Sequence, residues 1–194
     1  MAIRMATQQD IPRILEIYGP YVETTCISFE YTVPTREEFT RRFTSYTAQF
    51  PWLVWEEDGV ILGYAYGSAP WTRAAYGWSA EASVYVAPQA HRRGIGRALY
   101  EALEKLIFAQ GYRVIYCLIT TDNPGSVAFH QALGYRVVAE LPGCGYKFGK
   151  ELGIFYMEKR QNLTEYPSAP PIPIGELVKS DRNLQKLLSK ITLS

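Results

Sequence analysis

Two arginines and two glycines stand together in the stretch QAHRRGIGRALY, at Arg92, Arg93, Gly94 and Gly96. The stretch follows an alternating apolar segment and precedes a pattern with helical spacing. A backbone that wraps closely around an anion needs residues without Cβ, and the free amides at a helix N-terminus attract negative charge. These residues therefore predict a phosphate-binding turn.

Three interpretations of this turn compete. A Walker loop ends in Gly-Lys-Ser/Thr, whereas Gly96 is followed by Arg97 and Ala98. A dinucleotide fingerprint needs a small residue where Leu99 stands and an acidic residue about twenty positions further on, and residues 116–119 contain none. The third interpretation, a glycine-rich turn flanked by solvated arginines, stays open on this loop alone.

Composition limits the partners that the protein can have. The 194 residues carry 20 Lys+Arg and 19 Asp+Glu, a formal net charge of +1, so we expect neither nucleic acid nor a membrane as partner. The 3 cysteines lack CxxC spacing and are odd in number, which argues against a disulfide framework or a zinc site and favours a reducing compartment. The sequence shows no apolar signal region, so we expect a cytoplasmic protein without a bound metal.

The residues around the turn alternate between strand and helix patterns, which predicts an α/β fold with a mixed sheet. Asp58-Gly59 lies between two apolar runs and predicts a hairpin. Asp10 and Thr35 are the predicted N-caps of the first two helices. Strands are predicted at 2–6, on both sides of Asp58-Gly59, and at 80–88, 113–120, 135–141 and 153–160, and further helices at 94–110 and 126–134.

The character of the chain changes after Arg160. The stretch YPSAPPIPIG contains four prolines and predicts an extended linker. The residues after it have apolar side chains at helical spacing, which predicts a short amphipathic helix that packs on the body or on a partner subunit, with a membrane-surface role as the alternative; these are Leu184, Leu187, Leu188 and Ile191. We therefore expect one domain over residues 1–160, with a linker and helix over 161–194.

Two segments resemble the cofactor-binding segments of the GNAT acetyltransferase superfamily. The first, SVYVAPQAHRRGIGRALYEALE, is similar to a strand followed by Gln/Arg-x-x-Gly-x-Gly/Ala, with His91 in the first position of the loop. The second, TTDNPGSVAFHQALGY, has Asn123 before a short helix and ends in Gly134-Tyr135. The resemblance implies the GNAT-type fold, a mixed and mostly antiparallel twisted sheet flanked by helices.

The same resemblance implies acetyl-CoA as the acetyl donor, held mostly through backbone amides. The implied cofactor-binding residues are Val84, Tyr85, Val86, His91, Arg92, Arg93, Gly94, Ile95, Gly96, Arg97, Asn123 and Ser126.

Over residues 2–160 the chain resembles more narrowly the phosphinothricin and methionine sulfoximine N-acetyltransferase group. The segments that carry this resemblance are SFEY, FPWLVWEEDGVILGYAY, APWTRAAYGWSAEASVYV and ALGYRVVAELPGCGYKFG. It implies acetylation of the amino group of a small amino acid or analogue, and we expect a homodimer. Tyr146, Lys147 and Gly149 follow the group's pattern, but Lys150 and Glu151 stand where the group has a large aromatic residue.

Acetyl transfer to a protonated amine needs a base, a cradle for the developing oxyanion and an acid for the departing thiolate. Glu81 begins the strand that leads to the turn, on the same side as Ser83 and Tyr85. The resembling group carries a Glu at this position, acting directly or through water, so Glu81 is the predicted base. The alternative is a solvated carboxylate at a strand end.

His130 lies four residues before Gly134. Many GNAT enzymes have a tyrosine there that protonates the coenzyme thiolate, and the phosphinothricin group has histidine. The resemblance therefore implies that His130 is the acid. The alternative is a helix histidine satisfied by a neighbouring carbonyl.

The acceptor residues are predicted more loosely. Phe29 and Glu30 lie in the loop between the first two helices, and Arg73 and Tyr76 precede the strand of Glu81. An arginine suits a carboxylate or phosphinate, and aromatic walls suit an aliphatic stem. Ordinary packing of loop aromatics is the alternative.

Two other functions stay open from the sequence. A protein or ribosomal-protein N-acetyltransferase would share the donor chemistry but would need an open groove for a peptide. A non-catalytic acyl-CoA-binding module would keep the turn and could dispense with Glu81 and His130.

Overall fold

The computed structural model describes residues 1–161 and 169–180. It contains seven strands and five helices within these ranges: β1 (Ala2–Met5), α1 (Ile11–Thr24), α2 (Arg36–Thr47), β2 (Trp52–Glu57), β3 (Val60–Ser68), β4 (Ser79–Val86), α3 (Ile95–Ala109), β5 (Val114–Thr120), α4 (Pro124–Ala132), β6 (Arg136–Lys147), β7 (Lys150–Arg160) and α5 (Ile174–Ser180).

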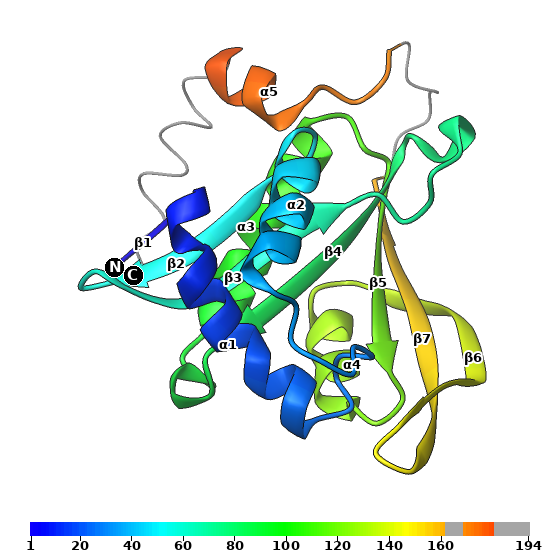
Figure 1. Ribbon diagram of the computed structural model, residues 1–194. Coiled ribbons are helices and arrows are strands. Elements are labelled where there is room, and N and C mark those ends of the chain that lie inside the picture. The colour runs from blue at the N-terminus through cyan, green and yellow to red at the C-terminus, as the bar shows by residue number, and fades with distance from the viewer. Residues whose placement is uncertain (162–168, 181–194) are drawn as a thin grey trace.

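The strands form one sheet in the order β1-β2-β3-β4-β5-β7-β6. Every neighbouring pair is antiparallel except β4 and β5, which are parallel because the chain crosses between them through α3. Helices α1 and α2 cover one face of the sheet, and α3 covers the other (Figure 1). The predicted mixed, mostly antiparallel sheet flanked by helices is confirmed.

Local sequence explains where these elements begin. Thr35 caps α2, its hydroxyl accepting a hydrogen bond from the Glu38 amide at 3.2 Å. Asp10 precedes α1 as predicted, but its carboxylate binds Arg4 at 2.7 Å instead of capping the helix. Asp58 and Gly59 both have positive φ values, 50° and 77°, as a two-residue hairpin turn of the predicted kind requires.

Aromatic side chains fill the layer between the sheet and the first two helices. Trp52 from β2 packs against Phe39 of α2, with ring centroids 5.7 Å apart, and stacks on Tyr66 of β3 at 4.4 Å. On the opposite face, α3 approaches β3 closely at Gly63, where a Cβ would lie 3.2 Å from side-chain atoms of Ile95 and Leu99. Large rings fill the space between the sheet and α1 and α2, and the missing side chain at Gly63 lets α3 pack closely on the other face.

The described part of the C-terminal extension packs onto the body. Helix α5 begins at Ile174, inside the predicted linker, and it buries Ile174 and Leu177. The buried amide of Gln110 donates to the carbonyls of Gln49 at 2.6 Å and Ile172 at 2.8 Å, which ties the extension to α3 and to the α2–β2 connection. The amphipathic helix predicted around Leu184 lies outside the described residues.

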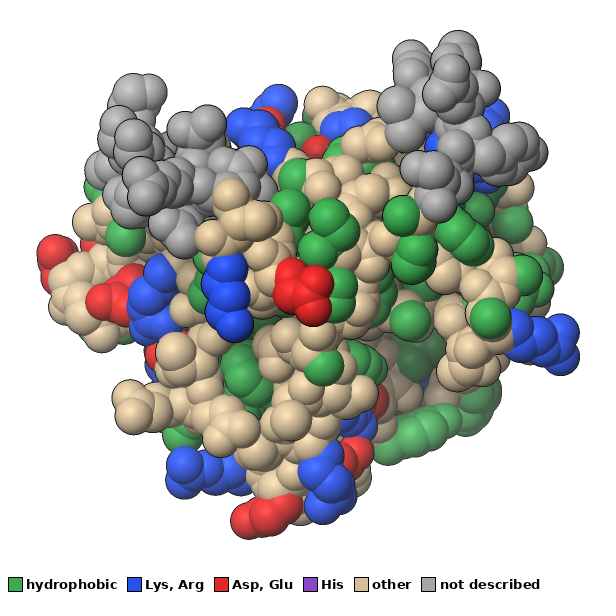
Figure 2. Space-filling model, turned by 90° about the horizontal axis from the view of Figure 1, so that it is seen from above, with side chains coloured by type: hydrophobic (Ala, Val, Ile, Leu, Met, Phe, Trp, Pro, Cys, Tyr) green, Lys and Arg blue, Asp and Glu red, His purple; other side chains and the backbone are tan. Residues whose placement is uncertain are grey.

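On the face of the molecule where α5 lies, no one type of side chain predominates among the described residues. Figure 2 shows basic, acidic and apolar side chains interspersed across this face. Within the described ranges, no helix combines the length and the apolar character needed to cross a membrane.

Candidate active site

A cleft opens where the two parallel strands of the sheet separate. Pairing between β4 and β5 runs only from Ser79–Val114 to Glu81–Tyr116. Beyond that point the strands diverge (Figure 1) and leave a cleft of about 560 Å³, lined by residues 82–86 of β4, residues 117–120 of β5 and the α4 residues Gly125, Ser126, Phe129 and His130.

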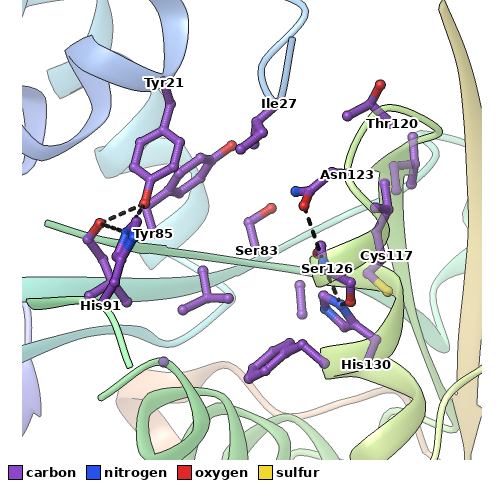
Figure 3. Close-up of a pocket in the computed structure, with 18 of the residues that line it drawn as sticks. Tyr21, Ile27, Ser83, Tyr85, His91, Cys117, Thr120, Asn123, Ser126 and His130 are labelled. Carbon is purple, nitrogen blue, oxygen red and sulfur yellow. Dashed lines mark hydrogen bonds between the residues drawn. The ribbon is translucent and has the colours of Figure 1, made fainter. Parts of the chain in front are cut away.

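The free edge of β4 presents backbone groups to this cleft. The Ala87 amide donates to Leu62 of β3 at 2.8 Å, and alternation along the strand turns the peptide groups of Ala82, Val84 and Val86 away from β3. The Val86 carbonyl confirms this direction, because it accepts hydrogen bonds from Tyr21 at 2.6 Å and from His91 Nε2 at 3.0 Å (Figure 3). The edge therefore offers amides and carbonyls that β5 does not use.

The glycine turn closes one end of the cleft. Arg92 and Gly94 adopt left-handed conformations, with φ values of 62° and 79°, immediately before α3 begins at Ile95. Such a turn points successive amides toward one point, and the helix dipole adds partial positive charge there. A Cβ at Gly94 would meet no protein atom within 4 Å, so the backbone conformation alone favours glycine at this position.

The arginines of the turn have different surroundings. Arg92 lines the cleft, whereas Arg93 is paired with Glu57 at 2.6 Å and Arg97 with Glu101 at 2.8 Å. Ile95 is only 1% exposed and belongs to the core. Of the predicted cofactor-binding residues, the structure places eight in the wall of the cleft: Val84, Tyr85, Val86, His91, Arg92, Gly96, Asn123 and Ser126.

Asn123 caps the helix on the other side of the cleft. Its side-chain oxygen accepts a hydrogen bond from the Ser126 amide at 3.1 Å, and Pro124 occupies the first position of α4. Because α4 begins here, its side chains at Ser126 and His130, one turn apart, both reach the cleft (Figure 3).

Glu81 is the last β4 residue that pairs with β5, and it directly precedes Ala82, the first β4 residue in the wall of the cleft. Alternation places it on the same face as Tyr85, whose ring packs edge-on against Tyr18 of α1. Its carboxylate forms no hydrogen bond or ion pair with any other described residue. Burial without a compensating partner raises the pKa of Glu81, so this carboxylate is a stronger base than a solvated one.

His130 is held in one tautomer. Its Nδ1 lies 2.8 Å from the Ser126 carbonyl, which can only accept, so Nδ1 carries the proton. Nε2 is then a hydrogen-bond acceptor, and it is buried without a partner among the described residues. Burial lowers the pKa of His130, so the imidazole is predominantly neutral at pH 7.

Aromatic rings surround His130 on its buried side. Its ring lies 4.9 Å from that of Tyr100 and 5.4 Å from that of Tyr135, both edge-on. The hydroxyls of both tyrosines are buried. Burial raises the pKa of both phenols, so they remain protonated and can act only as neutral hydrogen-bonding groups.

The predicted acceptor residues are divided between two places. Glu30 forms an ion pair with Arg42 of α2. Tyr76 packs on Trp71 at 4.9 Å, and the side chain of the exposed Arg73 makes no hydrogen bond or ion pair within the described chain. No described contact joins Arg73 or Tyr76 to Phe29 or Glu30, and none of the four lines the cleft.

Several residues of the cleft were not predicted. Ser83 could have been found by its alternation with Tyr85, whereas the β5 residues line the cleft only because the strands diverge. The residues missed by the sequence analysis are Tyr21, Ile27, Ala82, Ser83, Cys117, Leu118, Ile119, Thr120, Gly125 and Phe129.

Comparison with known proteins agrees with this geometry. Residues 3–153 match the model of the Acetyltransferase (GNAT) domain family. The chain is 35% identical to a phosphinothricin N-acetyltransferase of Streptomyces viridochromogenes, with 89% of this chain and 92% of that protein covered. It is 32% identical to an L-methionine sulfoximine/L-methionine sulfone acetyltransferase of Salmonella typhimurium, with 87% and 99% covered.

A solved structure shows the same fold with its donor bound. The phosphinothricin acetyltransferase of Sinorhizobium meliloti, in complex with AcCoA, superposes with a TM-score of 0.82 at 32% identity, covering 87% of this chain and 94% of that one. The divergent strands, the left-handed turn before α3 and the free β4 edge of our chain fit such a donor. The chain therefore belongs to the GNAT acetyltransferase family and uses acetyl-CoA as its acetyl donor.

Proposed function

We propose that this enzyme acetylates the α-amino group of a small amino acid or amino-acid analogue, of the phosphinothricin or methionine sulfoximine/sulfone type. The observation that carries the proposal is Glu81, a half-buried carboxylate without a partner among the described residues, directly before the β4 segment that lines the cleft. It lies on the face of the sheet that α1 covers, where the loop 25–35 connects α1 to α2. The names of the two curated relatives support the substrate class.

The chain's own residues divide between the two substrates. Acetyl-CoA supplies an acetyl group activated as a thioester. We assign the cofactor's pyrophosphate to the turn at Arg92–Gly96, and its amide-bearing arm to the free edge of β4. Residues from β5 and α4 form the other wall of the cleft.

Glu81 takes the proton from the attacking amine, directly or through one water molecule. Its raised pKa suits this role, because a base of higher pKa takes a proton more readily from an ammonium ion. His130 protonates the departing thiolate, and for this it must itself be protonated at the right nitrogen. Since Nδ1–H is bound to the Ser126 carbonyl, His130 must first gain a proton at Nε2 before it can donate one from there.

The acceptor screen tests the substrate class. Purified enzyme is supplied with acetyl-CoA and with methionine sulfone, methionine sulfoximine, phosphinothricin, their carboxyl esters and a short peptide, and thiol release is followed. The free amino acids should turn over, and the esters should react poorly because the carboxylate is lost. Efficient turnover of the peptide, with none of the free amino acids, would identify a protein N-acetyltransferase instead.

We further propose that the enzyme is a cytoplasmic homodimer. The free state of its three cysteines supports a reducing compartment. Strand β6 forms one edge of the sheet, and Val137, Val138 and Leu141 on it are 41–43% exposed. A second copy would bury this apolar edge. Light scattering should give twice the chain mass for the native protein and a lower mass for Val138→Lys.

A further inference from the structure

The residue that ends β6 is a lysine in the protein interior. Lys147 is only 2% exposed, and no described carboxylate forms an ion pair with it. Its ammonium group instead donates to two backbone carbonyls, those of Val22 and Ser28, each at 2.7 Å. Burying a charge without a counter-charge is costly, so the position of this lysine needs an explanation.

The two carbonyls belong to different parts of the chain. Val22 lies in the last turn of α1, where carbonyls have no partner within the helix. Ser28 lies in the loop 25–35, directly before the predicted acceptor residues Phe29 and Glu30. One ammonium group therefore fixes the loop relative to both the helix that precedes it and the β6–β7 hairpin.

The neighbours of Lys147 hold the same loop. The Tyr31 hydroxyl donates to the carbonyl of Tyr146. The Phe29 ring lies against Gly145, where an added Cβ would come within 2.9 Å of Phe29 Cδ2. Three consecutive residues at the end of β6 thus contact three residues of the loop, and Lys147 makes the only buried charged contact among them within the described chain.

We propose that Lys147 is a positioning residue that fixes loop 25–35 against β6 and thereby sets the affinity for the amine acceptor. We call the contacts of Lys147 with Val22 and Ser28 the clamp. The effect on the acceptor rests on the proposed function, whereas the clamp does not. Lys147 does not line the cleft assigned to acetyl-CoA, and loop 25–35 contributes a single residue, Ile27, to its wall. A loop already ordered before binding spares the acceptor the entropic cost of ordering it.

Hydrogen exchange on the full chain tests the clamp without any acceptor. Lys147→Met should accelerate exchange in loop 25–35 by about tenfold or more, because each lost hydrogen bond from a charged donor is worth at least that factor. Amides of β5 and α3 should keep their rates. Lys105→Met, at an exposed position of α3, is the control and should leave the loop unchanged.

Kinetics then test the consequence for the acceptor. In Lys147→Met the acceptor KM should rise about tenfold, while kcat and the calorimetric Kd of acetyl-CoA stay within about twofold to threefold. A residue with only a general structural role would weaken both substrates together. Equal loss of acetyl-CoA affinity would therefore overturn the proposal, as would unchanged exchange in loop 25–35.

Gly145→Ala provides a second variant that leaves Lys147 in place. The added methyl displaces the Phe29 ring, so it should raise exchange in the same loop and raise the acceptor KM in the same direction. If Lys147→Met does not fold, Lys147→Gln decides the question: its neutral amide cannot replace the two hydrogen bonds of the ammonium group, so exchange in loop 25–35 should rise, and an unaltered loop in Lys147→Gln would contradict the proposal. If no amine is acetylated by the native enzyme, the proposed function fails, while the exchange data still decide the role of Lys147.

Discussion

Glu81 is the proposed catalytic base, and its ionised carboxylate destabilises the folded protein. Glu81→Gln should lower kcat/KM about a hundredfold or more at neutral pH, the usual size of a general-base contribution. The loss should shrink at high pH, where the free amine is already deprotonated. A variant with near-native rates at pH 7 would show that another group takes the proton.

The same substitution should stabilise the fold. Burial raises the pKa of Glu81 above its ordinary 4.5, so ionisation is less favourable in the folded than in the unfolded chain. The native carboxylate therefore destabilises the protein increasingly as pH rises from the unfolded pKa to the folded one. Urea unfolding should show Glu81→Gln more stable than the native protein at pH 8, and this advantage should disappear at pH 4; a pH-independent difference would contradict it.

Burial of His130 affects the stability of the fold with the opposite pH dependence, because it destabilises the protein at low pH. Burial lowers its pKa below the ordinary 6.5, so the unfolded chain gains the proton first as pH falls. In urea unfolding, the native protein should lose stability relative to His130→Phe as pH falls below 6.5, and a difference that does not vary with pH would contradict this.

Kinetically, His130→Phe should leave the Kd of acetyl-CoA within about twofold and reduce kcat most for thioesters with a basic leaving thiol, since an acid matters most there. Equal reductions for basic and acidic leaving thiols would remove His130 from the acid role.

At the scale of elements, the turn before α3 must adopt a left-handed backbone conformation and must leave room for the pyrophosphate of acetyl-CoA. Gly94→Val places a β-branched residue at a φ of 79°, and its Cβ enters the space in front of the helix N-terminus. We expect calorimetry to show that acetyl-CoA binds about tenfold or more weakly. Separately, the left-handed conformation should destabilise the fold by roughly 1–2 kcal/mol, as it does for any L-residue.

The hairpin at Gly59 offers a matched control for this prediction. Its φ is 77°, and an added Cβ there meets nothing within 4 Å, as at Gly94. Gly59→Val should therefore lower the melting temperature by a similar amount and leave acetyl-CoA binding intact. If both variants lose the cofactor equally, the effect of Gly94 is general destabilisation and the turn does not hold the pyrophosphate.

At the scale of the whole molecule, the C-terminal extension contributes to stability far from the cleft. Ile174 and Leu177 bury their side chains, each worth about 1.5–3 kcal/mol. A chain ending at Gln161 should therefore unfold at a lower urea concentration than one ending at Ser180, with kcat unchanged at 25 °C. Coincident unfolding curves would show that α5 adds nothing to the fold.

The sequence by itself determined the order and type of most elements. Asp58-Gly59 specified a hairpin because both residues accept positive φ, and Thr35 specified a helix start because its hydroxyl caps a free amide. It also located the glycine turn before α3, since conformation there depends on local residues. These features need no information from distant parts of the chain.

Only the tertiary structure decided which groups meet at the cleft. Cys117 and Leu118 line it because β5 leaves β4 after Glu81, and strand separation has no local signature. The ion pair of Arg93 with Glu57, 36 positions away, directs a predicted phosphate ligand to a carboxylate on β2. Lys147 reads as a surface lysine in the sequence, yet long-range packing buries it. Burial and partners are set by contacts across more than a hundred residues of chain, such as that of Lys147 with Val22, 125 positions away, and spacing along the sequence does not encode them.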